Sequence, residues 1–391
     1  MSITYYYVRP TDSLFVRGNL AFGDSGEHGT GLMPPPPSLF AGAFRSALLG
    51  HDALQHAAFL GSGQCSDPKL AQCLGTPVAP GDFQITWLSL AGEPSAGATP
   101  EPISPLPADL LMIDKVFAKL QPRPVQTGVQ SSGNLPLRAT LNSAKQEKPK
   151  GGIYLSSKGF TLHLQGQSLD PVCGIESHHL FQRDPRLGIG LNTDAHTAEE
   201  GQIYTTEGFA FSPKDAKTPA KFVSTGFLVG IQGVEDVLPA QGQLRLGGDG
   251  RSAHYRRVTL TPPVTQLPVN AGRFRLLMQT PGLFALGWLP EGVVEQNGSY
   301  RLQGDGFSAR LACAALGRRD IVSGWDLYQW HPKPAQAAVP AGSVYWFDEF
   351  AGDAGKLARW VANGLWPRHP DLLQQTRRAE GYNRALLGAW N

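Results

Sequence analysis

Apolar and polar positions alternate in ways that predict strands in the first two thirds of the chain. Residues 3–8, ITYYYV, are β-branched and aromatic and precede the turn formers at 10–13, so they predict a first strand. Residues 186–211, RLGIGLNTDAHTAEEGQIYTTEGFAF, predict two strands about a polar loop, with Ile203, Tyr204, Phe209 and Phe211 as their apolar positions.

Two more strands, with a short helix between them, are expected before the proline pair at 262–263. The runs at 222–234 and 255–260 have the apolar content of strands, and a short helix is expected at 234–239 between them. Pro262 and Pro263 then form a plausible linker.

A helix is expected after the proline run Pro34–Pro37. That run holds the backbone extended, Ser38 is the expected N-cap, and Gly50 is the expected stop. The apolar residues that give the helix one buried face are Phe40, Phe44, Ala47 and Leu48. Gly42 leaves a shallow surface on it, where another backbone can come close.

Residues 52 to about 180 show little periodicity and contain proline-rich stretches, so they predict a loop-rich insertion. Past the linker the order of elements recurs, with strands at 273–284, 307–316 and 343–350 and an amphipathic helix at 354–366. The fold class expected is therefore α+β, with two ferredoxin-like (RRM-like) domains. Their bounds are 1–262, which includes the insertion, and 263–391.

Composition narrows the class of protein. A chain of 391 residues exceeds one typical core, and its net charge of +2 confines any polyanion site to a local cluster. The four cysteines show no zinc spacing and no disulfide framework. Because no apolar run approaches a membrane span and no signal peptide is evident, we expect a cytoplasmic protein without a membrane partner.

The stretch QGQLRLGGDGRSAHYRR, residues 241–257, concentrates positive charge around glycines. It contains four arginines and a single acidic residue, Asp249. Gly247, Gly248 and Gly250 fit an ordinary hairpin turn, and they equally fit a loop whose backbone N–H groups approach phosphates while Arg251, Arg256 and Arg257 neutralise them. Neither a dinucleotide fingerprint nor a P-loop is present, so we expect no cofactor.

Histidines and acids gather in a second polar region. His178 and His179 precede Asp194, His196, Glu199 and Glu200, but the spacing matches no known metal arrangement, and solvated side chains are the simpler interpretation. No nucleophile elbow occurs, and no cysteine has the context of a nucleophile. We therefore expect neither a metal site nor catalytic residues.

Several motifs in a fixed order resemble one family. They are PPPPSLFAGAFRSALL, RLGIGLNTDAHTAEEGQIYTTEGFAF, LRLGGDGR, TPGLFALGWLP, GWDLYQWHPKP with AVPAGSVYWF, and GYNRALLG. Together they resemble the RAMP superfamily, specifically subunit three of the type III-B CRISPR (Cmr) effector complex, an antiviral defense ribonucleoprotein. The resemblance runs from Tyr5 to the C-terminus, and the insertion is its least matched part.

The resemblance implies a non-catalytic RNA-binding subunit. It would hold the 5′ tag of the CRISPR guide RNA and join the Cas10-type large subunit to the guide-binding backbone RAMP subunits, and would meet target RNA only indirectly. The family's contact surface, with its glycine-rich loop, maps here onto Ser38, Gly42, Arg45, Arg183, Arg186, Gly247, Gly248, Gly250, Arg251 and Lys333.

Two other functions stay open at this point. Some RAMP relatives trim CRISPR precursor RNA without a metal, and His178, His179 or His254 would be the general base of such an endoribonuclease. A protein-interaction module with no RNA role is the third. Cleavage of a labelled repeat RNA in chelator would favour the enzyme, and absence of salt-dependent RNA binding would favour the module.

Overall fold

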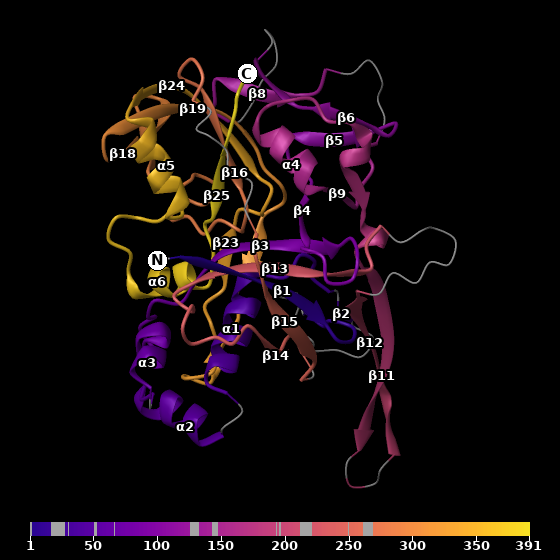
Figure 1. Ribbon diagram of the computed structural model, residues 1–391. Helices are drawn as coiled ribbons and strands as arrows, with labels where there is room; N and C mark the ends of the chain where they lie inside the picture. Colours follow the sequence, from indigo (N-terminus) through magenta and orange to yellow (C-terminus); the bar gives the residue numbers. More distant parts are fainter. Residues whose placement is uncertain are drawn as a thin grey trace.

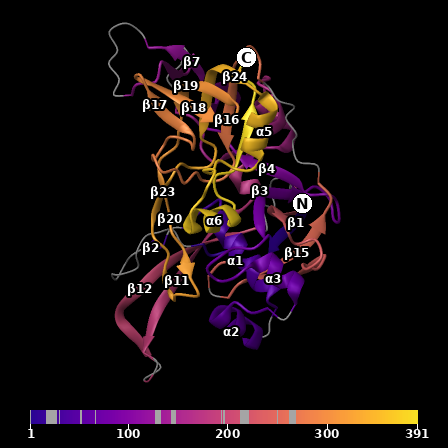
Figure 2. The same cartoon turned by 90° about the vertical axis from the view of Figure 1, so that its left-hand side faces the viewer.

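Two antiparallel sheets with helices packed against them form the body of the protein in the computed structural model (Figures 1 and 2). The structure describes residues 2–16, 28–29, 31–50, 53–65, 67–125, 133–142, 148–192, 194, 197–211, 221–248, 250–260 and 269–391. The coarse expectation of a mixed α+β protein is confirmed, since six α-helices accompany the sheets in the described part of the chain.

The first sheet has eight strands. In spatial order they are β10 (Gly174–Glu176), β9 (Ile153–Leu155), β4 (Glu101–Pro105), β3 (Gln84–Glu93), β13 (Ser224–Gln232), β1 (Ile3–Pro10), β15 (Ser252–Val258) and β14 (Gln241–Arg245). The predicted strands at 3–8, 222–234 and 255–260 are thus present with shifted ends. The short helix expected at 234–239 is wrong: the segment closes only a turn, with Leu238 N–H donating to Val234 O at 3.0 Å, because it is too short to propagate a helix.

Helix α1 (Pro37–Leu48) packs across one face of this sheet. Phe40 and Phe44 are fully buried, and Phe44 lies 5.6 Å from Tyr6 and 5.5 Å from Tyr255 between ring centroids. Ser38 does not cap the helix, because the proline run supplies Pro36 at the N-cap and Pro37 at the first helical position. Gly50 ends it as expected, in the left-handed conformation at φ 74°.

The interval predicted as an insertion contains a central strand. Strand β3, residues 84–93, pairs with β13 in the middle of the first sheet. Its side chains are buried on both faces, which removes the alternation that sequence patterns rely on. The same interval holds α2 (Ala53–Ser62), α3 (Pro68–Leu74), α4 (Ser157–Leu164), the hairpins β5 (Leu110–Ile113) with β6 (Val116–Lys119) and β7 (Gln121–Pro124) with β8 (Leu137–Thr140), and the 3₁₀ turns at Pro171–Cys173 and Ser177–His179.

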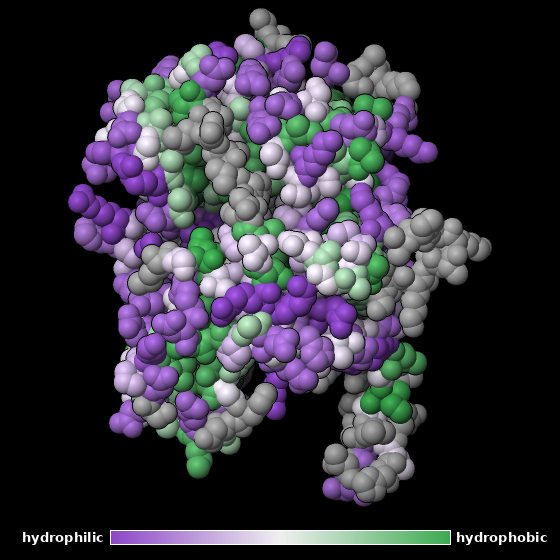
Figure 3. All heavy atoms as spheres, in the orientation of Figure 1, coloured by the Kyte–Doolittle hydropathy of each residue, from purple (hydrophilic) through white to green (hydrophobic). Residues whose placement is uncertain are grey.

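The predicted pair of strands at 186–211 forms a long hairpin beside the first sheet. Strand β11 (Gln182–Asn192) pairs with β12 (Thr197–Ala210), and β2 (His28–Gly29) adds to its edge. The hairpin extends away from the body at the lower right of Figure 1. Apolar side chains are exposed along it (Figure 3), among them Leu187 and Ile189.

The second sheet has six strands, in the order β17 (Val293–Gln296), β18 (Ser299–Gly304), β19 (Phe307–Ala315), β24 (Val344–Gly352), β16 (Phe274–Met278) and β25 (Ala385–Gly388). Helix α5 (Ala354–Ala362) buries Leu357 and Val361 against it and ends before Gly364, at φ 84°. Helix α6 (Leu372–Ala379), which no pattern predicted, begins with a capping box between Asp371 and Gln374. Two short pairs, β20 (Asp320–Val322) with β23 (Gln336–Ala338) and β21 (Trp325–Asp326) with β22 (His331–Pro332), lie between β19 and β24.

The two halves share a buried cluster. Phe160 and Leu164 of α4 pack with Leu277 and Trp346 of the second sheet. Beside them the Arg275 guanidinium donates to Asp109 and, at 2.6 Å, to the His163 carbonyl, all three residues being buried. The halves are therefore joined through a packed interface with an ionic core.

Candidate nucleic-acid interface

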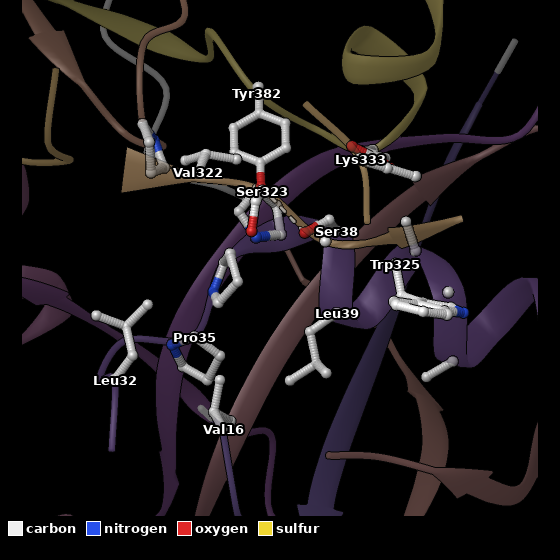
Figure 4. Close-up of a pocket in the computed structure, with 18 of the residues that line it drawn as sticks. Val16, Leu32, Pro35, Ser38, Leu39, Val322, Ser323, Trp325, Lys333 and Tyr382 are labelled. Carbon is white, nitrogen blue, oxygen red and sulfur yellow. Dashed lines mark hydrogen bonds and ion pairs between the residues drawn. The ribbon is translucent and has the colours of Figure 1, made fainter. Parts of the chain in front are cut away.

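A cleft of about 2270 Å³ lies where the two halves meet on the α1 side (Figure 4). Its walls come from the proline run with α1, from the loop at 245–248, and from residues 319–335 of the second half. In Figure 4 the apolar side chains of Val16, Leu32, Pro35 and Leu39 gather on the side away from Tyr382. The cleft therefore has an apolar side and a polar side.

A hydrogen bond joins the halves on the polar side. The Ser38 and Tyr382 hydroxyls are 3.0 Å apart, and the Arg377 guanidinium lies 5.5 Å from the centroid of the Tyr382 ring. Burial raises the pKa of Tyr382, so its hydroxyl stays protonated and can donate. Ser38, expected as a helix cap, instead helps to fix the floor of the cleft.

The structure brings six of the ten predicted binding residues to this one cleft. Those lining it are Ser38, Gly42, Arg45, Gly247, Gly248 and Lys333. Arg183, Arg186, Gly250 and Arg251 lie outside its lining. Residues from three distant parts of the sequence thus share one concave surface.

Gly42 is exposed on α1, and a Cβ added there would meet no atom within 4 Å. Among the residues that the structure describes, nothing requires glycine at this helical position, where it is less favourable than alanine. Because glycine has no side chain, Gly42 leaves a flat patch on the cleft wall.

Arg45 lies in the same wall, but its guanidinium turns inward. It donates to the Leu74 carbonyl at 3.1 Å, and burial lowers its pKa. The side chain therefore ties α1 to α3 as well as bordering the cleft.

The glycine-rich stretch is the loop of the β14–β15 hairpin, with Arg245 paired to Ser252. Gly247 has φ 86°, and a Cβ there would lie 2.6 Å from the Phe15 carbonyl oxygen, so glycine is required by the packing. The Gly248 N–H donates to that same oxygen at 2.9 Å. This amide is used within the protein, and Asp249 lies outside the described residues.

The arginines around the loop point in different directions. Arg251 binds Asp12 and lies 4.8 Å from the Phe15 ring centroid, while Arg256 donates to Glu93 at 2.8 Å. Arg257 donates to the Leu238 carbonyl at 3.2 Å. Since neighbouring strand residues face opposite sides, a run of arginines on β15 does not converge on one ligand.

Arg183 and Arg186 are held on the long hairpin. Arg183 donates to Glu207 at 3.0 Å, and Arg186 donates to Asp184 at 2.9 Å and lies 5.6 Å from the Phe15 ring centroid. Arg183 reaches the edge of the cleft through Glu207, which lines it.

Two arginines that sequence reasoning did not select line the cleft. Arg245 and Arg319 are exposed, and neither side chain has a hydrogen bond or ion pair among the residues that the structure describes. Arg245 was counted in the arginine-rich stretch but not chosen, and Arg319 belongs to the pair LGRRD, a weak signal by itself. These are the cations with free capacity for phosphate.

Lys333 is neutralised at the base of the β21–β22 hairpin. Its Nζ lies 2.6 Å from Glu380, which also accepts from the buried Arg377 at 2.9 Å. Lys333 therefore helps to hold its loop in place, and its charge is already paired with Glu380.

The three histidines considered as a general base lie away from the cleft, whereas His56 and His331 line it. His178 and His179 have ring centroids 4.1 Å apart, with His178 Nδ1 3.5 Å from Glu176, and His254 is exposed on β15. None of the three lines the cleft. Within the described ranges no three His, Cys, Asp or Glu residues come close enough to hold a metal ion, and His196 falls outside those ranges.

Comparison with protein families identifies the chain. The model of the family described as CRISPR-associated protein (Cas_Cmr3) matches residues 6–390. The chain belongs to this family. Comparison with curated proteins gives no match.

Solved structures show the fold of this Cas_Cmr3 family member. It is similar to a chain in the cryo-EM structure of the Type III-B Cmr-beta bound to cognate target RNA and AMPPnP, state 1, with 13% identity, a TM-score of 0.51, and coverage of 98% of this chain and 96% of that one. A chain of Type III-B Cmr-beta bound to cognate target RNA has the same identity and coverage and a TM-score of 0.48. Across the described residues, no helix has the length and apolar character needed to cross a membrane.

Proposed function

We propose that the protein is a non-catalytic subunit of a type III-B CRISPR effector complex that holds the 5′ tag of the guide RNA in the cleft between its halves. The observation that carries the proposal is the meeting of α1, the glycine loop and the 319–335 segment at one surface, within a chain of the Cas_Cmr3 family. A strand of RNA can lie along the flat patch at Gly42 while Arg245 and Arg319 bind its phosphates.

The same proposal assigns the subunit to the RAMP superfamily, as subunit three, with ferredoxin-like halves. Its support is the strand order: β15-β1-β13-β3 in the first sheet and β25-β16-β24-β19 in the second both follow the 4-1-3-2 order of a split βαβ unit. Each half keeps one helix at the expected place, α1 in the first and α5 in the second. A boundary near residue 262 separates the two, with the insertion in the first.

The partners proposed are the Cas10-type large subunit and the guide-binding backbone subunits, with target RNA met indirectly. Since a net charge of +2 gives little long-range attraction, the subunit would share its guide RNA with these neighbours.

The test measures binding of a labelled tag-containing guide RNA by the full chain, alone and with partner subunits, over a range of salt. Arg245→Ala and Arg319→Ala should each weaken binding and reduce the slope of log affinity against log salt by about 0.7. Arg359→Ala is the matched control, because Arg359 is exposed on α5 and does not line the cleft. Equal slopes for all three variants would remove the cleft from the RNA site.

One further measurement distinguishes the proposed function from that of a metal-independent endoribonuclease. The chain is incubated with labelled repeat RNA in chelator, and the RNA should remain intact because His178, His179 and His254 lie outside the cleft. Cleavage that disappears on His254→Ala or His178→Ala would replace the proposal with the enzymatic function.

A further inference from the structure

The β21–β22 hairpin presents aromatic side chains to solvent. Trp330 is 72% exposed, Trp325 48% and Tyr328 46%. Trp325 and Tyr328 line the cleft, and Trp330 lies just beyond its lining on the same hairpin. Exposed aromatics gathered on one turn are unusual in a soluble protein and point to a contact surface.

Trp330 adopts a backbone conformation that disfavours its side chain. Its φ is 54°, in the left-handed region that glycine and asparagine occupy readily and bulky residues rarely do. Burial does not offset this cost, because the indole is mostly exposed. A strained, exposed tryptophan is therefore better explained by what it contacts than by folding stability.

The two indoles leave ring faces uncovered. Trp325 and Trp330 meet edge to face, with centroids 5.8 Å apart and planes at 86°. In such a pair the ring that offers its edge keeps both faces free of its partner, and the other ring keeps one. A flat group can stack on an indole here without breaking the pair.

The base of the hairpin is held firmly. Lys333 N–H donates to the Gly324 carbonyl at 2.8 Å, and its Nζ binds Glu380. The buried Arg377 donates to the Ser323 carbonyl at 3.3 Å and to Gln336 at 2.9 Å. At the tip, Asp326 accepts from the Tyr328 and Gln329 N–H groups at 2.9 and 3.0 Å. The hairpin that carries the aromatic rings is therefore held in place by hydrogen bonds and an ion pair.

The surroundings favour nucleic acid over a protein partner. Arg319 lines the cleft one element earlier in the chain, Arg245 lines it from the glycine loop, and neither has an ion-pair partner among the described residues. Aromatic faces and free cations on one cleft match single-stranded RNA, whose bases stack while its phosphates are neutralised.

We propose that an unpaired base of the RNA strand stacks on the indole of Trp330 at the mouth of the cleft, with Trp325 as the second wall. This inference rests on the proposed function, because it needs a strand in the cleft. It adds a contact that depends on the presence of a base and on no particular base identity.

The test compares Trp330→Gly with Asn297→Gly. Both replace an exposed residue of positive φ, and Asn297 lies in the β17–β18 turn away from the cleft. Trp330→Gly should leave the melting temperature unchanged or raised, and should weaken binding of guide RNA by the full chain at least fivefold. Asn297→Gly should change neither quantity.

RNAs with one abasic nucleotide at successive positions then locate the stacked base. One abasic position should weaken binding to the wild type and have no further effect on Trp330→Gly. If the wild type binds RNA and Trp330→Gly binds it equally well, the stacking inference fails while the proposed function stands. If Trp330→Gly loses assembly with partner subunits but keeps its RNA affinity, Trp330 contacts a protein and the stacking inference is overturned. No RNA binding by the wild type, alone or assembled, would overturn both.

Discussion

Single residues in the cleft are of two kinds, those that the fold requires and those that it does not. Gly247 is needed because a Cβ would collide with the Phe15 carbonyl, and Lys333 is needed to neutralise Glu380. Gly42 and Trp330 have no such role, and each occupies a backbone position where another residue would be more stable. Residues that lower stability without a structural reason are the best candidates for contact with a ligand.

Gly42→Ala is therefore expected to separate stability from binding. The change should stabilise the protein by about 0.5–1 kcal/mol, because alanine favours the helix and meets no neighbour, yet it should weaken guide RNA binding by filling the flat patch. Gly61→Ala in α2 is the control, since it is equally open and does not line the cleft. Thermal unfolding and RNA titration measure the two effects, and a stabilised Gly42→Ala with full affinity would contradict the assignment.

At the scale of elements, helix α1 belongs to the core and the β11–β12 hairpin extends from it. Helix α1 is fixed by Phe40 and Phe44 in the core of the first sheet. The β11–β12 hairpin, in contrast, extends from the body and exposes Leu187 to 73% and Ile189 to 49%. These two side chains add little to the core, whereas Phe209 of β12 is buried in it.

Replacing Leu187 and Ile189 together by serine should leave the melting temperature within about 2 °C of the wild type, because surface changes away from packed features cost little. Phe44→Ala should instead cost about 3–5 kcal/mol, since a fully buried ring is lost. Urea unfolding of both variants makes the comparison. A large loss in the double serine variant would mean that the hairpin folds back on the body.

At the scale of the whole molecule, the cleft depends on how the halves are joined. The Asp109–His163–Arg275 cluster lies inside the junction. Burial alone would raise the pKa of Asp109, but His163 and the Arg275 guanidinium lower it to about 2. Burial lowers the pKa of His163. Both groups bind protons more readily when the chain is unfolded, so their contribution to stability is present at neutral pH and is lost on acidification.

Asp109→Asn should cost about 3–5 kcal/mol at pH 7, because Arg275 is left buried without its carboxylate. The share of stability that comes from Asp109 is full above about pH 4 and disappears as the pH falls toward 2, so the variant should show a shallower acid loss in that window. Urea unfolding from pH 7 to about pH 2 measures this. Asp305→Asn, whose side chain is 90% exposed, is the control, and an equal effect of the two variants would refute the junction's role.

The sequence by itself determined the elements whose apolar residues repeat with a clear period: β1, α1, the β11–β12 pair, β13, β15, α5 and three strands of the second sheet, β16, β19 and β24. Its motifs also pointed to the family that the profile comparison identifies. It missed β3, because a strand buried on both faces has no alternation, and it misplaced the helix at 234–239.

Only the tertiary structure decided which charged and aromatic side chains face the cleft. Arg251, Arg256 and Lys333 have the residue type of phosphate ligands, but Asp12, Glu93 and Glu380, far away in the sequence, bind them. Arg245 and Arg319 line the cleft and stay available because neither side chain forms an ion pair in the described part of the fold. Periodicity is a local property of the chain, whereas the partner of a charge is set by residues that only folding brings together.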